Sequence, residues 1–119
     1  MTSPKPDNIT YHQKSRLLEI SFNEGSNFKM SAEYLRVHSP SAEVQGHSLD
    51  QAVLQIGKEN VKIEAIDPVG NYAVILRFSD DHDTGIYAWE TLYELGKNQQ
   101  TNWENYLERL RAAGHERKL

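Results

Sequence analysis

Apolar residues change their spacing along this chain, from alternation in the first part to helical spacing near the end. In the stretch "LLEISF", Leu18, Ile20 and Phe22 fall on one face, which is typical of a half-buried strand. The later stretch "YAVILRF" is apolar on both faces, which is typical of a central strand. Strands first and helices last predict an α+β fold, with helices covering a mainly antiparallel sheet.

The remaining expected elements are short. The first strand should return as a hairpin through residues 28–30, and Ser31 is a suitable N-cap for a short helix that Pro40 ends. Further strands are predicted at residues 61–66 and 85–88, before two C-terminal helices at 89–96 and 101–114. Gly96 and Gly114 are expected to end these two helices, and Thr101 to Glu104 has the pattern of a capping box.

Length and composition limit the function classes. A chain of 119 residues fits one domain, which we place at residues 11–115, after a flexible leader at 1–10 and before a tail at 116–119. The net charge of −4 argues against nucleic-acid binding, which needs a basic surface. No cysteine is present, so thiolate chemistry is excluded. No apolar segment has membrane-spanning length or the form of a signal peptide, and we expect a cytoplasmic protein.

Histidines and carboxylates supply the only candidate chemistry. Imidazole and carboxylate groups together suit zinc or iron(II), and the candidate metal ligands are His38, His47, His82, Asp81 and Asp83. Their spacing is not diagnostic, so hydrogen-bonded loop and turn residues remain the alternative. His82 with a neighbouring carboxylate could also serve as an acid–base pair in a small enzyme, although no nucleophile motif accompanies it.

Three stretches carry a resemblance to a known family: "YLRVHSPSAEVQGH", "PVGNYAVILRFSDDHDTGIYAWETLYELG" and the helix from Trp103 to Gly114. Together they resemble the small bacterial family called domain of unknown function 971 (DUF971). That family is similar to the N-terminal domain of γ-butyrobetaine and trimethyllysine hydroxylases. The resemblance covers roughly residues 12–114, and it implies a GBBH-like N-terminal domain.

The resemblance implies a metal site that this chain has lost. In the hydroxylases the corresponding domain holds a structural zinc through three cysteines of one loop and a histidine of a later turn. Here Ser39, Ser41 and Val44 stand at the cysteine positions, and His82 keeps the histidine position. We therefore expect hydrogen bonds to hold the loop against the 80–83 turn, through Arg36 or His38 and one of the turn's aspartates, with Trp89 packing beside them.

The expected role follows from these losses. Such domains precede an oxygenase domain in the hydroxylases and are also fused to carrier proteins of iron–sulfur clusters. We expect this chain to be a non-catalytic accessory domain with a protein partner in iron or iron–sulfur protein assembly, without nucleic acid or membrane as partner. The alternatives are a zinc or iron protein that uses His38, His47 and His82, and a small acid–base enzyme.

Overall fold

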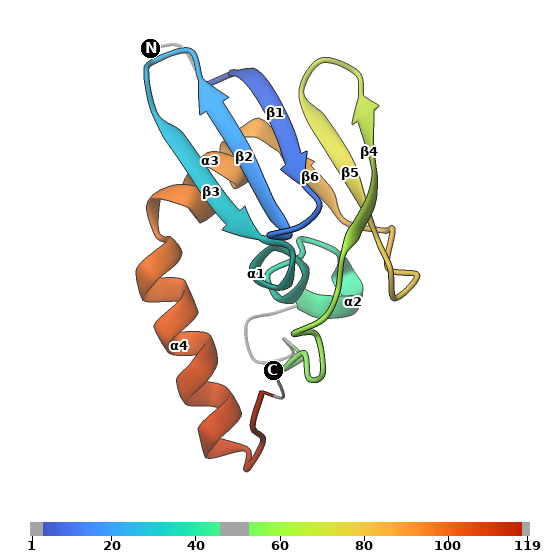
Figure 1. Ribbon diagram of the computed structural model, residues 1–119, viewed down its shortest axis with the longest axis vertical. Coiled ribbons are helices and arrows are strands. Elements are labelled where there is room, and N and C mark those ends of the chain that lie inside the picture. Colours follow the sequence, from blue (N-terminus) through green and yellow to red (C-terminus); the bar gives the residue numbers. More distant parts are fainter. Residues whose placement is uncertain (1–3, 46–52, 118–119) are drawn as a thin grey trace.

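Strand β2 (Leu17–Phe22) is the centre of the first sheet. It pairs antiparallel with β1 (Pro6–His12) and with β3 (Asn27–Ser31) in the computed structural model, which describes residues 4–45 and 53–117 (Figure 1). Strand β1 was not predicted, and it begins within the stretch assigned to a flexible leader. Only Ile9 and Tyr11 of β1 pack on the core, and two apolar residues are too few to reveal a period of two.

Strand β5 (Ala73–Phe78) is the centre of the second sheet, as its two-sided apolar pattern predicted. It lies antiparallel between β4 (Ile63–Val69) and the short β6 (Ile86–Ala88). The predicted α+β class is therefore confirmed, with its strands divided between two three-stranded antiparallel sheets within the described residues. The alternation pattern specifies which face of a strand is buried, but not which strands are neighbours.

The helix α1 (Ala32–Val37) links the two sheets and is buried along its whole length. Ser31 caps it as predicted, because its side-chain oxygen accepts a hydrogen bond from the Tyr34 amide at 3.0 Å. Glu33 and Arg36 are each only 6% exposed, so both charges need partners inside the protein. A single helical turn, α2 (Ala42–Gln45), follows Pro40.

The helices α3 (Trp89–Lys97) and α4 (Gln99–Ala112) close the described chain, as expected, but the predicted caps at their junction were wrong. Gly96 lies inside α3, where a Cβ would sit 2.4 Å from Cγ of Phe28, so this glycine permits close approach to the sheet. Helix α4 begins at Gln99 and leaves Asn98 alone between the helices, which places Thr101 within α4. Gly114 follows the end of α4, as predicted.

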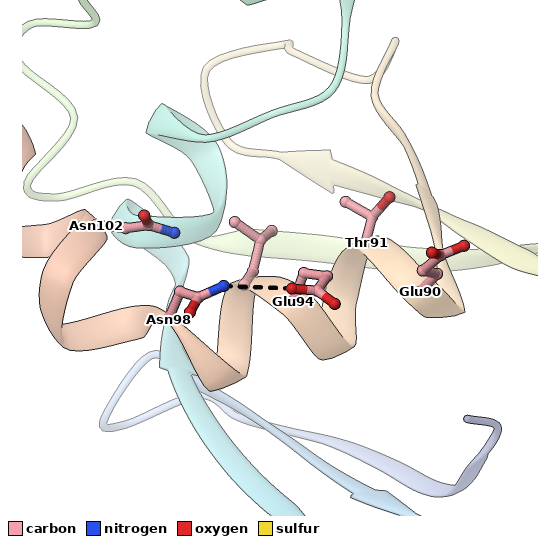
Figure 2. Close-up of a pocket in the computed structure, with 6 residues that line it drawn as sticks. Glu90, Thr91, Glu94, Asn98 and Asn102 are labelled. Atoms are coloured by element: carbon pink, nitrogen blue, oxygen red, sulfur yellow. Dashed lines mark hydrogen bonds between the residues drawn. The ribbon is translucent and has the colours of Figure 1, made fainter. Parts of the chain in front are cut away.

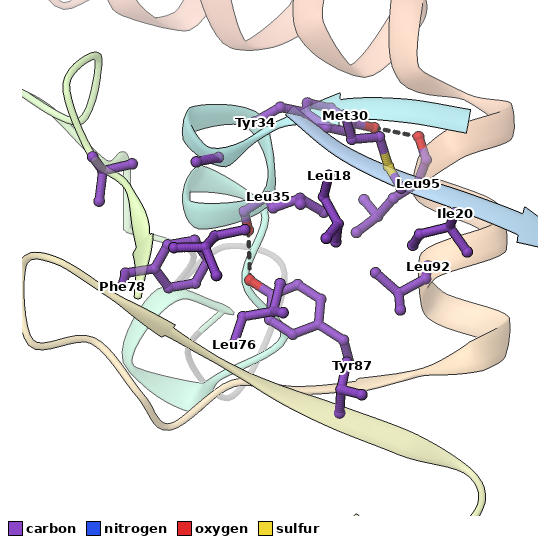
Figure 3. Close-up of a cluster of buried hydrophobic side chains, with 14 of the residues drawn as sticks. Leu18, Ile20, Met30, Tyr34, Leu35, Leu76, Phe78, Tyr87, Leu92 and Leu95 are labelled. Atoms are coloured by element: carbon purple, nitrogen blue, oxygen red, sulfur yellow. Dashed lines mark hydrogen bonds between the residues drawn. The ribbon is translucent and has the colours of Figure 1, made fainter. Parts of the chain in front are cut away.

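The main core fills the space between the two sheets, α1 and α3 (Figure 3). Leu18 and Ile20 of β2, Leu76 of β5 and Leu92 of α3 are all fully buried. Two buried tyrosines tie α1 into this core. Tyr34 donates its hydroxyl proton to the Leu95 carbonyl, and Tyr87 of β6 donates to the Leu35 carbonyl, each at 2.6 Å (Figure 3).

Candidate functional site

The loop after α1 packs against the turn after β5, as the family resemblance implied. Ser39 Oγ and His82 Nε2 lie 2.9 Å apart in a hydrogen bond, and the two residues are 0% and 5% exposed. Ser39 Oγ also accepts a hydrogen bond from the Ser41 amide, and Gln45 donates to the Ser39 carbonyl. We call the segments 38–45 and 80–85 the loop–turn contact. Its centre is a serine–histidine pair that the surrounding chain covers.

Charged side chains fix the edge of this contact. Arg36 Nε lies 2.9 Å from Asp80 Oδ2, and Lys58 Nζ lies 2.6 Å from the same oxygen. Burial opposes ionisation of Asp80, but the two cations hold the pKa of its carboxyl below the usual value. The predicted link between Arg36 and an aspartate of the turn is thus confirmed. Asp80 provides the negative charge that offsets the buried guanidinium.

Gly85, at the end of the turn, has no room for a side chain. A Cβ at Gly85 would lie 2.4 Å from Ser39 Oγ and 3.2 Å from Cε1 of Tyr87. Beside it, the hydroxyls of Ser41 and Thr84 lie 2.7 Å apart in a hydrogen bond. Loop and turn are therefore packed at van der Waals distance as well as hydrogen-bonded.

The carbonyl groups at the end of α1 obtain partners from the backbone as well as from side chains, since the Tyr34 carbonyl accepts from the His38 amide and the Arg36 carbonyl from the Ser39 amide. A helix leaves its last carbonyls without partners in its own backbone, and burial makes that costly. The Tyr87 hydroxyl satisfies Leu35, and His38 Nδ1 lies 2.9 Å from the Tyr34 carbonyl oxygen, so this ring nitrogen carries the proton. Burial raises the pKa of the Tyr87 phenol above its usual value and keeps it a donor.

The predicted metal ligands lie apart wherever the structure describes them. The His38 ring packs on Tyr34, with ring centroids 4.6 Å apart, whereas His82 contacts Ser39. Asp81 is exposed, and Asp83 pairs with Arg77 at 2.9 Å. Among the side chains that the structure describes, no three His, Cys, Asp or Glu residues form a possible metal site. His47 lies outside the described residues, so metal binding that involves it stays a prediction.

Acid should destabilise the protein through His38. Burial lowers the pKa of the His38 imidazole, with the nearby positive charge of Arg109 adding to the effect. Below the pKa of about 6.5 in the unfolded chain, the unfolded chain binds more protons than the folded one. The free energy of unfolding therefore decreases as the pH is lowered. Denaturant unfolding of wild type and His38→Gln at pH values from 7.5 to 5 should show a shallower fall for the variant. Equal slopes would contradict this assignment.

One hollow beside the helices lies away from the loop–turn contact. A space of about 340 Å³ is lined by Glu90, Thr91, Glu94, Leu95, Asn98 and Asn102 along α3 and the start of α4 (Figure 2). Its amides already have partners, since Asn98 donates to Glu94 at 3.3 Å and Asn102 donates to the Tyr34 hydroxyl at 3.1 Å. None of the predicted site residues lines this hollow.

Sequence reasoning missed two participants in the loop–turn contact. Lys58 pairs with Asp80 from a segment without regular structure, and no pattern in the sequence connects the two residues. Tyr87 lies in a strand of only three residues, and the packing role was assigned to the nearby Trp89, which has the larger ring. The alternation of exposed Ile86 and buried Tyr87 was the available signal.

Comparison with known proteins gives a consistent result. A family model described as gamma-butyrobetaine hydroxylase-like, N-terminal, matches residues 9–93. Two NMR solution structures are similar: one is 55% identical (TM-score 0.83, 98% of this chain and 90% of that chain), and the other 43% identical (TM-score 0.85, 98% and 92%). No protein with a curated description matches this chain.

A crystal structure offers a third comparison. It is described as a protein of unknown function that belongs to the DUF971 family, from Acidithiobacillus ferrooxidans ATCC 23270. It is 37% identical, with a TM-score of 0.65, and the match covers 77% of this chain and 92% of that chain.

Within the described residues, no helix is both long and apolar enough to cross a membrane.

Proposed function

The chain belongs to the family of gamma-butyrobetaine hydroxylase-like N-terminal domains, and on this premise we propose that it is a non-catalytic accessory domain. In this proposal the chain binds, in the cytoplasm, a protein that takes part in the assembly of iron or iron–sulfur proteins. The resemblance to domains that are fused to oxygenases and to iron–sulfur cluster carriers supports this choice of partner.

The buried hydrogen bond between His82 and Ser39 is the observation that carries the proposal. In a catalytic site, a general acid or base must reach the proton of its substrate. His82 is 5% exposed and Ser39 is 0% exposed, so the chain's own atoms cover the pair. Such a pair serves to hold the loop against the turn, which is a structural role. It disfavours the alternative of a small acid–base enzyme.

The donors at the four inherited positions do not fit a structural zinc ion. Zinc in such sites takes four thiolate, imidazole or carboxylate ligands. Here Val44 offers no donor atom and is 3% exposed, which suits packing in an apolar environment. The hydroxyl of Ser39 is already bonded to His82 and to the Ser41 amide. We therefore derive no role for a metal at these positions.

Affinity capture followed by reconstitution tests the proposal. The full chain, immobilised through its N-terminal end, should enrich a defined iron or iron–sulfur protein from native cytoplasmic extract. The two purified proteins should then form a complex of fixed stoichiometry. A chain with the hydrogen-bonded surface pair His12 and Glu19 of the first sheet replaced by alanine is a matched control, because neither residue belongs to the loop–turn contact or lines the hollows beside residues 115–117. An extract that yields no partner would contradict the proposal.

A further inference from the structure

A buried carboxylate on α1 is held by the chain's own tail. Glu33 is 6% exposed, and Arg117 binds it with two parallel hydrogen bonds, from Nε at 2.8 Å and from Nη2 at 2.5 Å. A buried carboxylate requires such a partner, because desolvation of an unpaired charge is costly. The two-pronged geometry fits the planar guanidinium of arginine and not the ammonium of lysine.

An aromatic ring forms the second wall of this pocket. Cζ of Arg117 lies 5.1 Å from the ring centroid of Trp103 on α4, within the range of a cation–π interaction. Burial, together with the negative charges of Glu33 and Glu59, raises the pKa of the neighbouring Tyr106 phenol to about 12. The Arg117 guanidinium thus lies between a carboxylate of α1 and an aromatic ring of α4, a combination that favours a guanidinium group.

The segment that places Arg117 in this pocket, residues 115–117, is called the tail from here on. It has few contacts other than those of Arg117. After α4 ends, residues 115–117 form neither helix nor strand, and the His115 amide donates to the Leu110 carbonyl at 2.9 Å. Among the residues that the structure describes, Arg117 makes all side-chain hydrogen bonds of this tail. Figure 1 shows the tail turning back from the end of α4 toward the segment before β4.

Hollows flank the tail on both sides. One, of about 330 Å³, lies against Leu107 and Leu110 of α4, and the other, of about 520 Å³, lies against Ile56 and Glu59. Ile56 is 45% exposed. His115 and Glu116 line both hollows, so open space lies along the segment that carries Arg117. Such a surface suits an extended segment that carries one arginine.

We propose that the pocket of Glu33 and Trp103 binds an arginine side chain from an extended segment of the partner protein, in competition with Arg117. This inference rests on the proposed accessory function and names the surface that the function uses. A tethered ligand has an effective concentration in the millimolar range, so a partner's arginine must outcompete Arg117. Removal of Arg117 should therefore raise the affinity for an added arginine peptide by about tenfold or more.

Titration with a defined peptide tests the site. The probe is the acetylated, amidated peptide Gly-His-Glu-Arg-Lys-Leu, with its arginine replaced by glutamine as the control. The indole N–H signal of Trp103 in the NMR spectrum reports binding to full-chain Arg117→Ala, to wild type and to Glu33→Gln/Arg117→Ala. We expect saturable binding to Arg117→Ala, at least tenfold weaker binding to wild type, and loss of binding with Glu33→Gln or the glutamine peptide.

Three outcomes would overturn the proposal: equal affinity for all three chains, equal affinity for both peptides, or signal changes remote from Trp103. If Arg117→Ala does not fold, Arg117→Lys replaces it, since lysine keeps the charge but lacks the two-pronged geometry. A wild-type dimer that Glu33→Gln abolishes would identify a second copy's tail as the occupant, and would overturn the assignment to another protein. Failed titration with intact partner capture rejects this site alone, whereas failed capture rejects the proposed function.

Discussion

Replacement of Tyr87 by alanine should lower the free energy of unfolding by about 3–5 kcal/mol, the usual cost of removing a buried aromatic ring. Tyr87 is 0% exposed, and its hydroxyl satisfies the Leu35 carbonyl at the buried end of α1. The variant loses the ring from the core and leaves that carbonyl without its partner. Small domains have only about 5–15 kcal/mol of stability, so the effect is large.

Tyr87→Phe separates the two contributions. It keeps the ring and removes only the hydroxyl, so its cost should be about 1–3 kcal/mol, the penalty of an unsatisfied buried acceptor. Denaturant unfolding of wild type and both variants, with circular dichroism as the readout, measures the two steps. A Tyr87→Ala cost below that of Tyr87→Phe would refute the structural role assigned here.

Gly85→Ala should destabilise the loop–turn contact by about 1–3 kcal/mol, the usual cost of an added methyl group in a packed site. The new Cβ would lie 2.4 Å from Ser39 Oγ and would push that hydroxyl away from His82. Ser39→Ala removes the same oxygen, and by itself it should cost about 1–3 kcal/mol through the lost hydrogen bonds.

A double-mutant cycle distinguishes this clash from a general effect. In Gly85→Ala/Ser39→Ala the added methyl no longer meets the hydroxyl, so the combined cost should be smaller than the sum by about 0.5–3 kcal/mol. Urea unfolding of the wild type, the two single variants and the double variant gives the coupling energy. Costs that simply add would show that the methyl group strains some other part of the contact.

Sequence reasoning succeeded where a local pattern determines the structure. The cap at Ser31, the end of α1 before Pro40 and the central position of β5 each follow from a few neighbouring residues. The contact between loop and turn followed from the family resemblance, since a shared metal requires the two segments to meet. The Arg36–Asp80 ion pair confirms this contact.

Sequence reasoning failed where contacts between distant segments determine the structure. In the sequence Gly96 resembles a helix cap, but it lies inside α3. A glycine is needed there because the Phe28 ring packs where a Cβ would be. Trp89 was predicted to pack beside the loop, and its partly buried ring does pack against the main core. Tyr87 was missed, because its hydroxyl reaches Leu35, more than fifty positions earlier in the chain. Such a distant contact leaves no local signal.

Metal content and thermal unfolding of the tag-free protein, with and without chelator, test the central claim most directly. The claim is that Ser39–His82 and the packing around it hold the loop without a metal. As a positive control, Ser39→Cys/Ser41→Cys/Val44→Cys places thiolates at the three inherited positions and should bind about one zinc, since three thiolates and His82 complete a tetrahedral set. The wild type should contain well below one equivalent of zinc or iron, with the same melting temperature in chelator. One equivalent of bound metal, with a melting temperature that falls when chelator removes it, would contradict the claim.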